Sequence, residues 1–68
     1  MLRVKDVNRL KVFGFEKDGT FYKKERPFEQ YAIFVEAETR KINACGNMSY
    51  ILDEMFELFA ANLVERVN

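Results

Sequence analysis

The chain has 68 residues, of which 49% are hydrophobic and 32% charged, with one cysteine and no histidine. A chain of this length predicts one domain, residues 1–68, that buries only about 60% of its unfolded surface. Such a small core usually needs a disulfide, a metal or a second subunit. One cysteine excludes an intramolecular disulfide, and with no histidine it excludes a zinc site. We therefore expect no metal, no cofactor and a homo-oligomer, in the simplest case a dimer.

Charge is unevenly distributed along the chain, although the net charge is zero. Residues 1–26 carry a formal charge of +4, and residues 27–68 a charge of −4. This asymmetry indicates either complementary ends of the fold or of two subunits, or an anionic ligand on the N-terminal half. The first ten residues are charged and have no apolar signal segment, and no apolar run approaches the ~20 residues of a membrane span. We expect a cytoplasmic protein without a membrane segment.

The segments VFGFE and FYKKE flank Lys17–Thr20 and predict a first β-hairpin. A three-residue loop with a glycine bulge pairs Phe15 with Phe21, whereas a two-residue loop places Glu16 opposite Phe21. A one-residue slip exchanges the faces of a strand, so the match of apolar residues favours the first register. In that register Phe13, Phe15 and Phe21 are core residues. Residues 1–8 fit a short strand, a helical turn or a loose arm.

A second hairpin follows Pro27, which cannot donate to a strand ladder. The segment QYAIFVEAE alternates, with Tyr31, Ile33, Val35 and Ala37 on one face and Ala32, Phe34, Glu36 and Glu38 on the other. The segment KINAC returns from it. A two-residue turn at Thr39-Arg40 places Ala37 opposite Ile42 and Val35 opposite Ala44. A longer turn with a shifted register is the alternative.

A long helix is predicted from about Ser49 to Val67, with Asn47 or Ser49 as its N-cap. Its apolar arc is wider than the stripe of an ordinary surface helix. One flank holds Ile51, Met55 and Leu58, and the other holds Leu52, Phe56, Phe59, Leu63 and Val67. One flank can cover the sheet, and we assign Ile51, Met55 and Leu58 to the interface of an antiparallel dimer. The alternative is that the N-terminal apolar residues, Met1, Leu2, Val4 and Val7, cover this flank.

These elements predict an α+β fold. Its sheet is small and antiparallel, with three to four strands in two consecutive hairpins that form a meander. One long C-terminal helix packs on one face of this sheet.

Catalytic chemistry has little support in the sequence. Histidine is absent, and Glu36 and Glu38 are best interpreted as a solvated strand face rather than a carboxylate pair. Cys45 has no identifiable base, and neither Gly14 nor Gly19 has the spacing of a phosphate loop. We therefore expect a protein that is not an enzyme.

The leading hypothesis is a non-enzymatic interaction module, a homodimer that binds or modulates another protein. The alternative is a small nucleic-acid-binding protein. In that case the segment FYKKER would combine an aromatic ring for base stacking with cations for phosphates. Its contact residues would be Tyr22, Lys23, Lys24 and Arg26.

Overall fold

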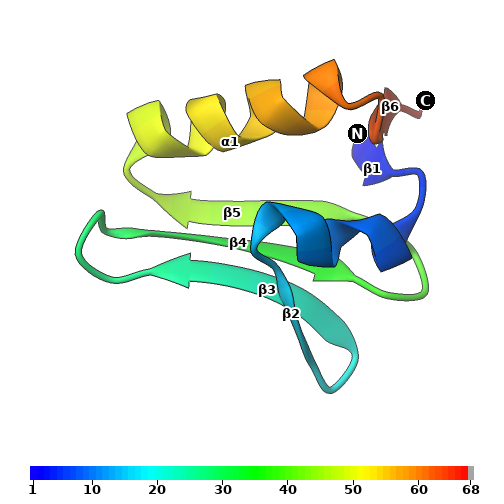
Figure 1. Cartoon of the computed structure of the whole chain (residues 1–68), viewed down its shortest axis with the longest axis horizontal. Coiled ribbons are helices and arrows are strands. Elements are labelled where there is room, and N and C mark those ends of the chain that lie inside the picture. Colours follow the sequence, from blue (N-terminus) through cyan, green and yellow to red (C-terminus); the bar gives the residue numbers. More distant parts are fainter. Residues whose placement is uncertain (68) are drawn as a thin grey trace.

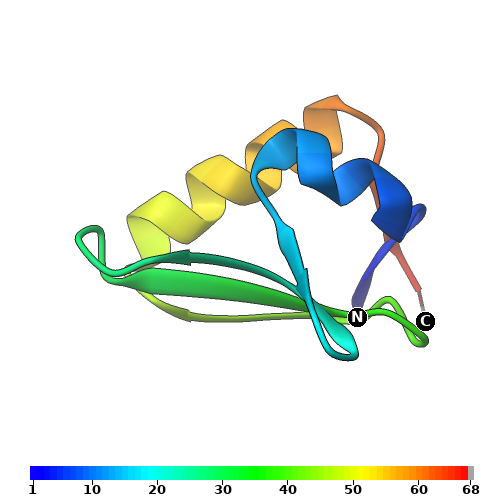
Figure 2. The same ribbon diagram turned by 60° about the horizontal axis from the view of Figure 1, so that its bottom comes forward.

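The computed structural model describes residues 1–67 and confirms the α+β fold, with an antiparallel meander and one C-terminal α-helix packed on it (Figure 1). In chain order the elements are β1 (Leu2–Val4), the 3₁₀ helix η1 (Val7–Phe13), β2 (Glu16–Asp18), β3 (Phe21–Arg26), β4 (Tyr31–Glu36), β5 (Ile42–Gly46), α1 (Met48–Ala60) and β6 (Val64–Arg66). Strands β2 to β5 form a four-stranded sheet in sequence order, and β1 and β6 form a separate pair. Figure 2 shows α1 and η1 on the same face of the larger sheet.

The second hairpin has the predicted faces but a different turn. The structure pairs Val35 with Ile42 and Ile33 with Ala44, two residues away from the register of the two-residue turn. The longer turn places Arg40 at φ 63°, and its amide donates to the carbonyl of Glu36 over 2.8 Å. A shift of two residues preserves the face of every side chain. The predicted core side of β4 and β5 is therefore correct, although the two-residue turn is wrong.

The first hairpin differs more from its prediction. Asp18 pairs with Phe21 around a two-residue turn that begins with Gly19, at φ 61°, so neither predicted register is present. The odd shift from the preferred register exchanges the faces of β3, because alternate residues of a strand point to opposite sides. Tyr22 therefore faces the core, and Phe21 is 38% exposed. The prediction that Phe21 is a core ring is wrong.

Residues 7–13 explain this change, since they form η1 rather than the first hairpin strand. Gly14 ends η1 in the left-handed region, at φ 89°, and its amide donates to the carbonyl of Lys11. The next amide, of Phe15, reaches back to the carbonyl of Leu10, as in a Schellman cap. Phe15 is buried and Phe13 packs against the core, as predicted for these two rings. Both rings enter the core from η1 and its C-terminal cap rather than from a strand. Only Glu16–Asp18 remain to form β2.

Helix α1 begins as predicted and ends early. Asn47 is its N-cap, and the Asn47 side chain accepts a hydrogen bond from the amide of Ser49. At the other end Asn62 lies at φ 58°, and the amide of Leu63 donates to the carbonyl of Leu58 over 3.0 Å. This Schellman cap stops the helix and turns the chain into β6. The prediction of a helix to Val67 is therefore wrong by about two turns, since α1 ends at Ala60.

The two ends of the chain meet after this turn (Figure 1). Strand β6 runs antiparallel to β1, with Val4 opposite Val64, and the amide of Val67 donates to the carbonyl of Met1. The amide of Val4 also donates to the carbonyl of Arg40, which joins β1 to the turn before β5. Residues 1–8 are therefore a strand followed by the start of η1.

The core lies between the larger sheet and the two helices. Its members are buried apolar side chains from β1, η1, β3, β4, α1 and β6. The six that are most completely buried are Val4, Leu10, Ile33, Val35, Leu58 and Leu63. Of the four N-terminal residues considered as a cover for the helix, Val4 is in this core, and Leu2 and Val7 pack against it.

Candidate interaction surfaces

The helix flank that we assigned to a dimer interface faces the chain's own sheet. Ile51, Met55 and Leu58 are only 5%, 9% and 1% exposed. They belong to the same core as Val4 and the residues of β4. In the folded chain these side chains are not available to a second copy. The two flanks of α1 have therefore exchanged the roles that the sequence analysis gave them.

The other flank of α1 is left uncovered. Its apolar side chains are Met48, Leu52, Phe56 and Phe59, which are 62%, 51%, 70% and 46% exposed. They follow one another at spacings of four, four and three residues, so they form a single row on the helix surface. We call these four residues the exposed row of α1. Leu63, predicted for this flank, lies beyond the helix end and is fully buried.

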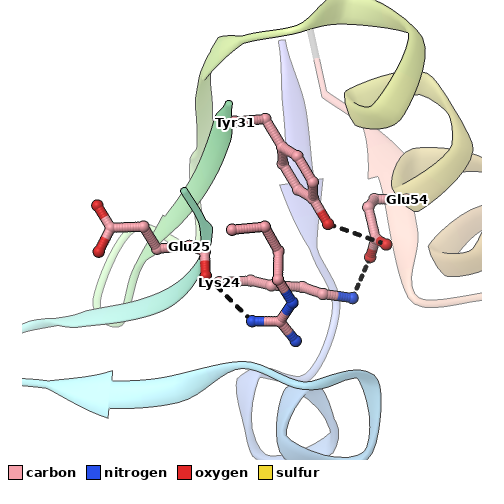
Figure 3. A network of polar contacts seen from close by, with 5 residues as sticks. Lys24, Glu25, Tyr31 and Glu54 are labelled. Carbon is pink, nitrogen blue, oxygen red and sulfur yellow. Dashed lines mark hydrogen bonds and ion pairs between the residues drawn. The ribbon is translucent and has the colours of Figure 1, made fainter. Parts of the chain in front are cut away.

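A polar contact fixes the rotation of α1 about its axis. The Nζ atom of Lys24, in β3, donates to the Oε2 atom of Glu54, and the hydroxyl of Tyr31, in β4, donates to its Oε1 atom over 3.3 Å (Figure 3). Lys24 is only 8% exposed. Desolvation, followed by the charge of Glu54, raises the pKa of Tyr31. Through this contact the Glu54 side of α1 is directed towards β3. The exposed row is on the opposite side of the helix, which is directed towards the edge strand β5 and the solvent beyond it.

The four residues of the predicted nucleic-acid surface do not form one surface. Tyr22 is 5% exposed in the core, and Lys24 is buried beside Glu54. Lys23 faces the opposite side of β3 and forms an ion pair with Asp18 over 3.0 Å. Arg26 is exposed, and its Nη1 atom donates to the carbonyl of Glu25. The shifted register of the first hairpin thus separates the ring and the cations.

The face of the larger sheet that points away from α1 is a second uncovered surface, which we call the outer face. In the observed registers its strand residues are Glu16, Asp18, Phe21, Lys23, Glu25, Ala32, Phe34, Glu36, Asn43 and Cys45. The rings of Phe21 and Phe34 pack edge to face, with centroids 6.5 Å apart. Among residues 1–67 no helix covers this face (Figure 2).

Charge on the outer face is predominantly negative. Four carboxylates lie there with one amine, that of Lys23, and the hydrogen bond and charge of Asp18 raise the pKa of Lys23. Glu36, predicted on a solvated strand face, is partly buried here, and Glu38 is exposed in the following turn. Cys45 is an exposed free thiol on this face.

The sequence predicts the apolar flank that holds Leu52, Phe56 and Phe59 but not its exposure, and it does not predict the aromatic pair of the outer face. Each depends on which side of an element is covered, and the pattern of apolar residues is similar on both sides. Gly14 and Asn62 are the residues that could have indicated the ends of η1 and α1, since glycine and asparagine commonly end helices in the left-handed conformation.

Within residues 1–67 the structure contains no pocket and no cluster of three or more metal-binding side chains. No helix of this part of the chain combines the length and apolarity of a bilayer span. A scan against protein-family models gave no match, and searches of curated proteins and of solved structures found no similar protein.

Proposed function

We propose that the protein is a small, non-enzymatic interaction module, a homodimer that binds another protein. The exposed row of α1 is the observation that carries the dimer. Four large apolar side chains lie in line on a chain whose whole accessible surface is 4639 Å². Contiguous apolar surface of this kind is typical of interaction sites rather than of scattered exposed residues.

A second copy fits this row because the row is free of charge. In a twofold dimer the same surface patch of both copies forms the interface. A charged residue in that patch would therefore lie close to the same charge on the partner. Asp53 and Glu57 lie on the far side of α1 and stay in solvent. Two antiparallel helices at an interaxial distance of about 8–10 Å would interdigitate their rows. The neighbouring edge strand β5, whose residues Ala44 and Gly46 are exposed on the side of α1, would supply the rim.

Sedimentation equilibrium between low and high micromolar concentration tests this dimer. We expect the mass to rise towards twice the chain mass of 8.1 kDa. The double variant Leu52→Glu/Phe56→Glu should remain a monomer, because it places four like charges in the interface. Val12→Glu/Thr20→Glu is the matched control, since it adds the same charge to exposed positions outside α1. A wild-type protein that stays at 8.1 kDa, or a control that dissociates equally, would refute the dimer.

A further inference from the structure

The outer face differs from the exposed row in the kind of partner that its charges permit. Its centre is apolar: Phe34, in β4, packs against Phe21, in β3, and Ala32, two residues before Phe34, is opposite Cys45 in β5. Carboxylates surround this centre. Asp18 and Glu36 flank Phe21 across the strands, and Glu25 is opposite Ala32.

Most carboxylates of this face form no ion pair within the described residues. Among residues 1–67 the ion pairs are Lys23–Asp18 and Lys24–Glu54. The carboxylates of Glu16, Glu25 and Glu36 therefore lie on the face without a cationic partner. Within the strands of this face Lys23 is the one cation, and it is paired with Asp18. Lys41 lies next to Glu36 just before β5, where its carbonyl accepts from the amide of Glu36, so the four carboxylates still outnumber the two amines.

This distribution of charge argues against three occupants. A second copy would bring two negative faces together, and like charges across an interface weaken association. A nucleic acid would bring phosphates to the same carboxylates, whereas its binding depends on cations. An anionic lipid surface would be repelled for the same reason. An occupant of this face must supply positive charge and an apolar group.

We propose that the outer face of the sheet binds a basic segment of another protein, in which arginine or lysine residues flank an aromatic or large apolar side chain. The apolar side chain packs on Phe34 and Phe21, and the flanking cations pair with Glu16 and Glu36. Arginine is favoured because its planar group pairs with a carboxylate and also stacks on an aromatic ring. This inference names the partner of the module proposed above and rests on that function. The two surfaces are separate, since the dimer uses the opposite side of the sheet (Figure 2).

Three matched synthetic peptides test this inference. The first repeats Arg-Ser-Phe-Ser three times, the second replaces each arginine by glutamate, and the third replaces each phenylalanine by serine. Amide chemical shifts of the labelled protein locate the binding site. The alkylation rate of Cys45, the only thiol of the chain, reports whether this face is covered. We expect only the first peptide to bind strongly, to shift residues around Phe34 and to slow alkylation several-fold.

Charge variants show whether the carboxylates of this face select the peptide. Glu16→Gln/Glu36→Gln should weaken binding of the first peptide about fivefold at low salt, the combined effect of two ion pairs at the protein surface. Asp53→Asn/Glu57→Gln removes the same charge from the exposed side of α1 and should leave the affinity unchanged. Phe34→Ser should weaken binding without changing the salt dependence.

Several results would overturn the inference. They are no binding of the first peptide, equal binding of the glutamate peptide or of a single-stranded DNA, shifts that map to α1, or equal loss in the two charge variants. The dimer and this inference fail separately. A monomeric wild-type protein that binds the peptide on the outer face refutes only the dimer. A dimer that does not bind the peptide refutes only the basic partner.

Discussion

The two flanks of α1 are nearly equivalent in composition and have opposite environments. Ile51, Met55 and Leu58 are at most 9% exposed, whereas the residues of the exposed row are at least 46% exposed. Apolar character therefore does not decide which flank the sheet covers. The rotation of the helix decides it, and two features fix that rotation. Lys24 and Tyr31 hold Glu54 on one side, and the cap at Asn62 directs the chain into β6 at the end.

Matched truncations on the two flanks should give the largest contrast. Leu58→Ala leaves a cavity in the core, and we expect it to lower the free energy of unfolding by about 3 kcal/mol. Leu52→Ala removes the same atoms from an exposed position, and we expect a change within about 0.5 kcal/mol. Urea denaturation at a concentration where the protein is monomeric measures both. Equal losses in the two variants would contradict the assignment of the buried flank.

Removing the cation beside Glu54 should have the next largest effect. Lys24→Met leaves a mostly buried carboxylate with only the hydroxyl of Tyr31, and we expect a loss of about 2–3 kcal/mol. Adding Glu54→Leu to this variant should restore much of the loss, because the unpaired charge is then absent. Lys23→Met is the control, since Lys23 forms its ion pair on the other face with the exposed Asp18. A double variant as unstable as Lys24→Met alone would contradict this role of the pair.

Alkaline pH should weaken the same contact to a smaller extent. The pKa of Tyr31 is raised above its ordinary value of 10.0, so the folded protein retains a proton that the unfolded chain releases. The resulting stabilisation is complete below pH 10.0 and is lost as the pH rises through the folded-state pKa. Tyr31→Phe should cost about 0.5–1 kcal/mol at neutral pH and make the urea midpoint fall less steeply above about pH 10.

Lys23 requires a control in this measurement, because its pKa is also raised and its ion pair with Asp18 is lost in the same range of pH. Lys23→Met removes that contribution and leaves Tyr31 in place. Parallel pH profiles of Tyr31→Phe and the wild-type protein would show that the pKa of Tyr31 is the same in the folded and unfolded states.

Local patterns were sufficient for the parts of the fold with local causes. The alternation from Tyr31 to Glu36 gave the correct faces of β4, and Asn47 gave the correct start of α1. The prediction of the first hairpin was wrong because Phe13 and Phe15 match a strand pattern but pack on the core from η1 and its cap. The predicted end of the helix was wrong because apolar positions continue after Ala60, while the left-handed conformation of Asn62 stops the helix.

Hydrophobic periodicity and caps act over a few residues, so local patterns were enough to predict an α+β chain with more apolar surface on α1 than one sheet can cover. Which apolar surfaces stay exposed depends instead on how the elements pack. The odd register shift at Gly19 moved Tyr22 and Lys24 into the core and Phe21 out of it. The contact between Lys24 and Glu54 then set the rotation of α1. Lys24 and Glu54 are thirty positions apart, so their contact does not follow from the sequence neighbours of either. The register of the hairpin follows from η1, which takes up residues 7–13 and shortens the first strand.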